Sequence, residues 1–271
     1  MSANQSAKIY GKRPGGSSDL QTGKTVLRIR GLYKSFGGVV ATDHVSLDIA
    51  AGEVHAIIGP NGAGKTTLVS QLSGLLKPDA GEIIFQDEDI TRLPAHRRAH
   101  VGLARSFQIT SVFMDMSVLD NVALAIEARN TRLFQFWTPF RSLGLLQRAA
   151  IEKLAVAGLA ERASVPASDL SHGERRQLEI AMALGSEPDM LLLDEPMAGM
   201  GREETGRMVE MLKSLKGITM LLVEHDMDAV FALADRITVL VYGRVLATGM
   251  PAEIRQNPEV IHAYLGEPDV A

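Results

Sequence analysis

The feature that most constrains this chain is an eight-residue segment, GPNGAGKT, at residues 59–66. It fits the pattern G-x-x-x-x-G-K-[ST], in which glycines let backbone N–H groups turn inward around phosphate oxygens. Lys65 can then contact the β- and γ-phosphates, and the Thr66 hydroxyl can bind Mg²⁺. Side chains at Gly62 and Gly64 would obstruct that approach and disfavour the required dihedral angles. The segment therefore predicts a binding loop for a nucleoside triphosphate.

The flanking residues put this loop between a strand and a helix. Residues 54–58 (VHAII) are typical of a buried strand, and residues 67–72 (TLVSQL) of the start of a helix. A phosphate bound there would lie at a helix N-terminus, where unpaired N–H groups and the helix dipole favour an anion. This context favours a phosphate site over the alternative, a glycine-rich turn that matches the pattern by chance.

The composition excludes several other classes of protein. A chain of 271 residues with 46% hydrophobic content can bury a large core as one domain. Its net charge of −4 argues against a nucleic-acid-binding surface, which normally needs a basic stripe, and the lack of cysteine excludes disulfides and thiolate metal sites. No apolar run approaches the ~20 residues that span a bilayer. Because the N-terminus also lacks the apolar region of a signal peptide, we expect a cytosolic protein.

The order of the expected elements predicts an α/β fold. Residues 1–24 are rich in Ser, Gly, Gln and Lys and predict a flexible tail before one ordered domain at 25–271. From residue 189 onward, short apolar strands alternate with helices, which indicates right-handed βαβ units and a mostly parallel sheet. An antiparallel β subdomain and an α-helical subdomain inserted at about 112–165 complete the expected core. We expect strands at 26–29, 44–49, 81–85, 190–193 and 218–223, and helices at 118–129, 143–159, 175–184, 203–216 and 227–234.

Two carboxylates follow the apolar strand at residues 190–193 (MLLL). In an open parallel sheet, ligands bind at the carboxyl ends of the strands, which is the edge where the phosphate loop lies. Asp194 can hold the Mg²⁺ that bridges the phosphates, and Glu195 can polarise an attacking water. A surface pair at a strand end is the alternative, and the phosphate loop upstream favours the functional interpretation.

A second candidate site is the string LSHGERRQ at residues 170–177, which opens a helix. Ser171 and Glu174 have the spacing of a capping box, so an ordinary helix cap is one interpretation. The string also resembles the signature motif of the ABC-transporter ATPases, usually written LSGGQ, from which it departs at His172 and Glu174. In that family the helix N-terminus points at the γ-phosphate bound by a partner subunit. The resemblance implies that Ser171 and Gly173 contact a partner's nucleotide.

Further positions match this family in order and spacing over about residues 26–266. Gln108 resembles the Q-loop glutamine that contacts Mg²⁺ and joins the core to the helical subdomain. His225 resembles the switch histidine that hydrogen-bonds the γ-phosphate, and Phe36 lies where the family stacks an aromatic ring on adenine. Gly201 departs from the pattern, because many members have Asp there at the end of the D-loop.

The resemblance therefore implies ATP and Mg²⁺ as ligands and assigns a full set of site residues. The expected catalytic residues are Glu195, His225 and Gln108. The expected Mg²⁺ ligands are Thr66, Gln108 and Asp194. The residues expected to bind the nucleotide are Phe36, Gly59, Pro60, Asn61, Gly62, Ala63, Gly64, Lys65, Thr66, Thr67, Ser171 and Gly173.

Within the family, import ATPases for branched-chain amino acids are the most similar branch. The similar strings are GLARSFQ at 102–108, MSVLDNV at 116–122, DEPMAGM at 194–200 and AYLGE at 263–267. Members of that branch work with two transmembrane permease subunits and a second ATPase, fed by an extracytoplasmic solute-binding protein. The resemblance thus implies a cytoplasmic subunit, peripheral on the inner face of the membrane, paired with a related ATPase or a second copy.

Three alternatives stay open at this point. Importers of urea or short amides and lipopolysaccharide-transport ATPases are near neighbours of the branched-chain group. A regulatory ATPase of the same fold, working without a permease, is a different class, although many soluble members carry two tandem phosphate loops and this chain has one.

The aromatic cluster at 134–140 (FQFWTPF), flanked by Arg132 and Arg141, either packs within the helical subdomain or receives a permease helix near the membrane.

Overall fold

The computed structural model describes residues 23–105, 112–129, 140–215 and 217–265, so the predicted tail at 1–24 lies almost entirely outside the described residues. The strands are β1 (Thr25–Phe36), β2 (Val39–Ala50), β3 (Val54–Ile58), β4 (Ala80–Phe85), β5 (Glu88–Asp89), β6 (Leu103–Arg105), β7 (Met190–Asp194), β8 (Thr219–Val223), β9 (Arg236–Val241) and β10 (Arg244–Gly249). The helices are α1 (Lys65–Leu72), α2 (Ala95–His100), α3 (Val118–Arg129), α4 (Phe140–Val156), α5 (His172–Gly185), α6 (Arg202–Ser214), α7 (Met227–Leu233), α8 (Pro251–Gln256) and α9 (Pro258–Leu265), with 3₁₀ turns at Ala160–Arg162 and Ala167–Asp169.

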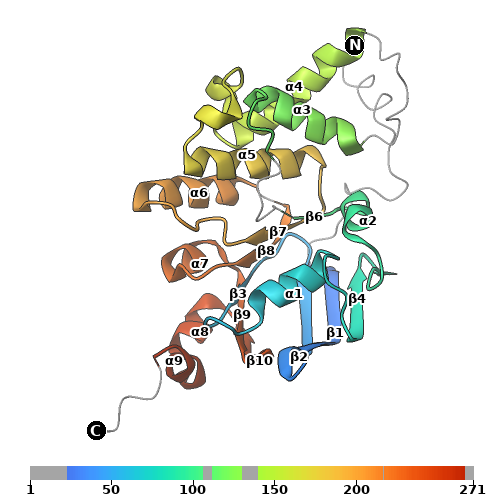
Figure 1. Ribbon diagram of the computed structural model, residues 1–271. Helices are drawn as coiled ribbons and strands as arrows, with labels where there is room; N and C mark the ends of the chain where they lie inside the picture. The colour runs from blue at the N-terminus through green and yellow to red at the C-terminus, as the bar shows by residue number, and fades with distance from the viewer. Residues whose placement is uncertain (1–22, 106–111, 130–139, 216, 266–271) are drawn as a thin grey trace.

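In the described part of the chain, the strands form two sheets (Figure 1). The larger has the order β10-β9-β3-β8-β7-β6, and its neighbours are parallel except for the antiparallel pair β10–β9. The smaller, β2-β1-β4-β5, is antiparallel throughout. Between β6 and β7 the chain forms α3 and α4, which gather with α5 at one end of the molecule (Figure 1). The predicted fold class is confirmed: a mostly parallel core, an antiparallel β subdomain and an inserted helical subdomain.

Helix α1, which follows the phosphate loop, is enclosed by both sheets (Figure 1). One buried cluster contains Leu27 of β1, Leu68 and Leu72 of α1, and Leu192 of β7. Each fully buried leucine contributes about 1.5–3 kcal/mol relative to an exposed one. The helix is therefore held by apolar packing on two sides, which fixes the direction in which its N-terminus points.

The predicted element boundaries agree best where the local pattern is strongest. Strand β3 and helix α3 have the predicted limits, whereas α4 starts and ends three residues earlier than the predicted 143–159. Gly158 explains the early end, because it has a φ of 74° and its N–H donates to the carbonyl of Ala155 (3.1 Å). A positive φ at this position terminates the helix and turns the chain.

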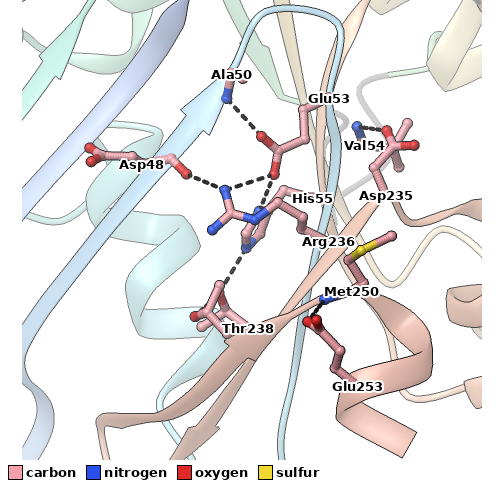
Figure 2. A network of polar contacts seen from close by, with 11 residues as sticks. Asp48, Ala50, Glu53, Val54, His55, Asp235, Arg236, Thr238, Met250 and Glu253 are labelled. Carbon is pink, nitrogen blue, oxygen red and sulfur yellow. Dashed lines mark hydrogen bonds and ion pairs between the residues drawn. The ribbon is translucent and has the colours of Figure 1, made fainter. Parts of the chain in front are cut away.

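A buried polar network joins the two sheets at the start of β3 (Figure 2). His55 is fully buried; its Nδ1 lies 2.7 Å from Oε1 of Glu53 and its Nε2 lies 2.8 Å from the Thr238 hydroxyl on β9. The other Glu53 oxygen accepts from the N–H of Ala50 at the end of β2 (2.8 Å). Burial works to raise the pKa of Glu53, but the hydrogen bonds from His55 and Ala50 hold it below its usual value. An ionised carboxylate thus ties β2 to the parallel sheet.

Arg98 holds the C-terminal end of α1. Its guanidinium is almost completely buried and donates to four backbone carbonyls, at 2.8 Å from Gln71, 2.6 Å from Leu72, 2.8 Å from Leu93 and 3.0 Å from Thr91. Burial lowers the pKa of this guanidinium to about 10, which still leaves it charged at neutral pH. A cation at the C-terminus of a helix satisfies unpaired carbonyls and complements the helix dipole.

We expect Arg98→Met to lower the free energy of unfolding by at least about 3 kcal/mol, because each orphaned buried acceptor costs about 1–3 kcal/mol. Arg98→Lys, which keeps the charge and reaches fewer carbonyls, should be intermediate. The neighbouring exposed Arg97→Met is the matched control and should stay within about 0.5 kcal/mol of the wild type. Urea unfolding of the three variants measures these differences. Equal stability of the Arg98 and Arg97 variants would contradict the role given to Arg98.

Candidate nucleotide-binding site

The predicted phosphate loop lies between β3 and α1, and glycines are required in it for two reasons. Gly64 has a φ of 97°, and a Cβ at this position would overlap the carbonyl oxygen of Ala41 on β2. Gly62 has a φ of 81° with open space around it, so only the backbone conformation requires glycine there. At Gly59 a Cβ would overlap the carbonyl oxygen of Leu240 on β9. The backbone of both sheets therefore packs closely against the loop and restricts its conformation.

Lys65 lies inside the loop. Its Nζ donates to the carbonyls of Gly59 (2.6 Å) and Pro60 (3.0 Å), and the residue is 8% exposed. Burial lowers the pKa of this amine, and the carboxylates of Glu195 and Asp194 oppose that shift. The lysine is thus close to both predicted acidic residues, as a shared phosphate and metal site requires.

The remaining loop residues present polar groups around this lysine. Asn61 and Gly62 are exposed at the outer side of the loop, and Thr66 is exposed in the first turn of α1. Thr67 is partly buried one residue further along. The buried Ala63 anchors the loop, because its carbonyl accepts from the N–H of Gly243 in the β9–β10 turn (3.0 Å). The Thr66 hydroxyl is therefore free of the core and accessible to a ligand.

Asp194 ends β7 and is paired with Arg105 of the neighbouring strand β6. Their side chains are 1% and 8% exposed, and Nη2 of Arg105 lies 2.9 Å from Oδ2 of Asp194. Burial raises the pKa of Asp194, and the guanidinium partly offsets that rise. Arg105 also donates to the hydroxyl of Ser73 (3.1 Å). Sequence reasoning missed Arg105 as a site residue, although its position at the end of a short strand before Gln108 is a usable signal.

Glu195 follows Asp194 with a backbone conformation that is uncommon for a residue with a side chain. Its φ is 48°, and its N–H donates to the carbonyl of Val223 at the end of β8 (2.8 Å). Non-glycine residues in this region cost about 1–3 kcal/mol and cluster at functional sites. The side chain is partly exposed, so it can reach a water. The positive φ thus turns the backbone at Glu195 away from the extended conformation of β7.

A buried glutamate that sequence reasoning missed connects the ends of β7 and β8. Glu224 is 1% exposed; its Oε1 accepts from the N–H of Met197 (2.8 Å) and its Oε2 from the N–H of His225 (3.0 Å). Burial raises the pKa of this carboxyl, while these hydrogen bonds favour the charged form. Next to it, the ring of His225 is 66% exposed, in a position to reach a ligand. An acidic residue directly after an apolar strand is the same signal that identified Asp194.

Phe36 ends β1 at the hairpin that leads into β2. Its side chain is 52% exposed, and the amine of Lys34 lies 5.4 Å from the centre of its ring. The hairpin is connected to the phosphate loop, since Ala41 on β2 contacts Gly64. An exposed aromatic ring on this strand can offer its face to a base.

The signature segment opens α5 with the predicted capping box. The Ser171 hydroxyl accepts from the N–H of Glu174 (3.2 Å), and the Glu174 carboxylate accepts from the N–H of Ser171 (2.8 Å). Gly173 is buried against Glu204 of α6, where a Cβ would approach the Glu204 Oε1 to 2.9 Å. Within the described residues, no hydrogen bond joins this segment to the phosphate loop of the same chain. The exposed Ser171 and the rest of the capping box are therefore positioned by contacts with α5 and α6 and not by the phosphate loop.

Three predictions fall outside the described residues: Gln108, the aromatic cluster at 134–140 apart from the backbone of Phe140, and the end of the AYLGE string. Among the residues that are described, no three His, Asp or Glu side chains converge as a metal site. The residues nevertheless fit Mg²⁺ bound with a nucleotide, because this ion typically takes one or two protein ligands together with phosphate oxygens and water. A buried carboxylate at Asp194 and an accessible hydroxyl at Thr66 match that donor set.

Comparison with known proteins gives a consistent result. The family model described as "ABC transporter" matches residues 42–198, and that described as "Branched-chain amino acid ATP-binding cassette transporter" matches residues 244–270. The chain is 40% identical over 250 residues to the high-affinity branched-chain amino acid transport ATP-binding protein LivG of Escherichia coli K12, covering 89% of this chain and 98% of LivG. It is 39% identical to the corresponding protein BraF of Pseudomonas aeruginosa, covering 90% and 99%.

A solved structure agrees with these sequence matches. The ADP conformation of MJ1267, an ATP-binding cassette of an ABC transporter, superposes with a TM-score of 0.79 at 31% identity, covering 90% of this chain and 99% of MJ1267. Among the described residues, none of the helices combines the length and the apolar character needed to cross a membrane.

We expect Glu224→Gln to lower the free energy of unfolding by about 1–3 kcal/mol and to slow nucleotide hydrolysis. Both carboxylate oxygens accept a backbone N–H, and an amide has a single oxygen, so one donor at Met197 or His225 loses its partner. The control variant is Glu210→Gln, because Glu210 forms a surface ion pair with Lys213. We expect this variant to change the free energy of unfolding by no more than about 0.5 kcal/mol. Urea unfolding and steady-state hydrolysis measure both variants. If Glu224→Gln matches this control in both measurements, Glu224 does not organise the site.

Proposed function

Because this chain belongs to the ABC transporter family, whose ATP-binding subunits hydrolyse ATP, we propose that it couples ATP hydrolysis to the import of branched-chain amino acids or similar small solutes. The observation that carries the proposal is that the phosphate loop with Lys65 follows β3 at the same edge of the sheet at which Asp194 and Glu195 end β7, because β3, β8 and β7 are parallel neighbours. A cation for phosphates, a carboxylate for Mg²⁺ and a carboxylate for water then meet at one edge of the sheet.

In the proposed mechanism, the loop N–H groups and Lys65 bind the phosphates, and Phe36 stacks on the adenine. Thr66, Asp194 and Gln108 would hold Mg²⁺, which would supply positive charge to the phosphates. Electrostatic stabilisation by groups positioned in advance is the main source of rate in phosphoryl transfer. The ordering of charged groups around Lys65 supports these assignments.

The reaction itself depends on two further groups. Glu195 accepts a proton from the attacking water, and His225 hydrogen-bonds the γ-phosphate. Ser171 and Gly173 close over the nucleotide of a partner subunit, so that ATP is bound between two chains. The exposed ring of His225 and the exposed Ser171 at the N-terminus of α5 support this division of roles.

The choice of solute rests on similarity. LivG and BraF are named as branched-chain amino acid transport proteins, and the family model for residues 244–270 carries the same description. Specificity should reside in the permeases and the binding protein, because no site residue proposed here contacts a transported solute. Import of urea or short amides, and a regulatory role without a permease, are the competing functions. Permease genes next to this gene would favour transport.

The proposed assembly follows from the same premise. We propose that the ATPase domain spans residues 25–271, with a helical subdomain at about 112–165; the predicted tail at 1–24 lies almost entirely outside the described residues. The chain binds two transmembrane permease subunits from the cytoplasmic side and pairs with a related ATPase or a second copy. A solute-binding protein delivers the cargo from outside, and the aromatic cluster at 134–140 is a candidate contact for a permease helix.

The catalytic assignment predicts different defects in two variants of the site. Glu195→Gln should bind ATP normally and hydrolyse it at least about 100-fold more slowly, because the amide keeps the shape and cannot accept a proton. Lys65→Ala should bind ATP weakly, because the phosphates lose their main counter-charge. Equilibrium binding of ATP and phosphate release by the purified complex separate the two effects. Normal turnover by Glu195→Gln would remove it as the base, and normal binding by Lys65→Ala would overturn the loop assignment.

The transport assignment predicts that deleting the gene abolishes uptake of leucine, isoleucine and valine. Wild-type protein should restore uptake, and Glu195→Gln should not, because cargo moves only when ATP turns over. Uptake of labelled branched-chain amino acids, urea and short amides by the deletion strain distinguishes the candidate solutes. Undiminished uptake of all of them, in a strain without a redundant transporter, would reject the import function and leave the ATPase assignment intact.

A further inference from the structure

His172 stands in the signature string where the family motif LSGGQ has a glycine, and its side chain makes a contact that glycine cannot make. It is the first residue of α5, and its Nε2 lies 3.0 Å from the carbonyl oxygen of Ala198. Ala198 belongs to the segment at 196–201 that joins Glu195 to α6. Because a carbonyl only accepts, Nε2 must carry a hydrogen and donate it.

The accepting peptide is tied on its other side to the predicted catalytic base. The N–H of Ala198 donates to the carbonyl of Glu195 (3.1 Å), while the carbonyl of Ala198 accepts from His172. Two consecutive hydrogen bonds therefore connect the N-terminus of the signature helix with the backbone of Glu195 in the same chain.

The ring of His172 is also fitted against the segment. Gly199 has a φ of 77°, and a Cβ there would lie 3.3 Å from Nε2 of His172, so glycine both allows the turn and makes room for the ring. One turn further on, Glu204 of α6 packs against Gly173, and its Oε2 accepts from the N–H of Gly201 (3.2 Å). The segment is thus held to α5 directly at Ala198 and, through Glu204, at Gly201.

We propose that His172 is a positioning residue for ATP hydrolysis, which holds the segment at 196–201 and with it the backbone of Glu195 in the active geometry. The inference rests on the proposed role of Glu195 as the base. The histidine that replaces glycine in the motif would thus have a function within its own subunit, in addition to the role of the motif toward a partner subunit.

The chemistry of the contact defines a pair of matched variants. His172→Phe keeps an aromatic ring of similar size and removes the donor. His172→Gln keeps a donor, because the amide nitrogen of glutamine is the same number of bonds from Cβ as Nε2 of histidine. The control variant is His262→Phe. His262 is exposed on α9 and lies far along the chain from the residues of the site.

The test compares these variants in the full-length chain, purified with the permease and ATPase subunits that accompany it. We expect His172→Phe to lower kcat about two- to tenfold, the factor that corresponds to one net hydrogen bond, with KM for ATP and the midpoint of thermal unfolding unchanged. His172→Gln should restore kcat, and His262→Phe should match the wild type. The split between kcat and KM and the rescue by glutamine distinguish positioning from general damage.

Two outcomes would overturn the proposal: wild-type kcat in His172→Phe, or a His172→Gln variant as slow as His172→Phe. Glu195→Gln is measured in parallel, since it reports separately on the proposed function. Collapse of turnover in Glu195→Gln with a silent His172→Phe would reject only the positioning role. Normal turnover in Glu195→Gln would reject the proposed catalytic base, whatever the histidine variants do.

Discussion

Two backbone carbonyl groups, one from each sheet, determine the shape of the nucleotide-binding loop. The carbonyl of Ala41 on β2 faces Gly64, and that of Leu240 on β9 faces Gly59. A side chain at either glycine would overlap main chain, which cannot move without separating the sheets. The loop is therefore a product of how the antiparallel and parallel sheets dock as much as of its own sequence, and the glycines are the residues that allow this docking.

The same docking is secured at two other places by buried polar groups. Arg98 binds the carbonyls at the C-terminus of α1, and the Glu53–His55–Thr238 network joins β2 to β3 and β9 (Figure 2). Helix α1 is thus fixed at both ends, by the loop glycines at its N-terminus and by a guanidinium at its C-terminus. Groups that must bind a ligand without reorganising are best placed on such rigid elements.

The sequence predicted the parts of the site whose signal is local. The loop at 59–66, the carboxylates after β7 and the capping box at Ser171 each depend on residues within a few positions of one another. Strand β3 has the expected limits and β7 is one residue longer than expected, whereas α5 begins at His172, three residues before the expected start. Arg105, Glu224 and Arg98 were not predicted, because their roles arise from tertiary contacts. Arg105 meets Asp194 across 89 positions, and Arg98 meets Leu72 across 26. The positions of Arg105 and Glu224 at strand ends mark them as candidates, but no periodicity or spacing encodes the partners that they contact.

The charges around the loop give a physical reason why a divalent cation accompanies the nucleotide in the proposed mechanism. The carboxylates of Asp194 and Glu195 already favour the charged form of Lys65, and Arg105 is paired with Asp194. A triphosphate bound beside two carboxylates would be repelled by their negative charge, and one lysine and the loop N–H groups offset this repulsion only in part. Charges in a buried site are weakly screened by solvent and salt, so the repulsion there is strong. A cation bound between Asp194 and the phosphates would turn that repulsion into attraction. In the proposed mechanism the buried, poorly solvated carboxylate of Asp194 would be its ligand, and the partly exposed Glu195 would be accessible to water.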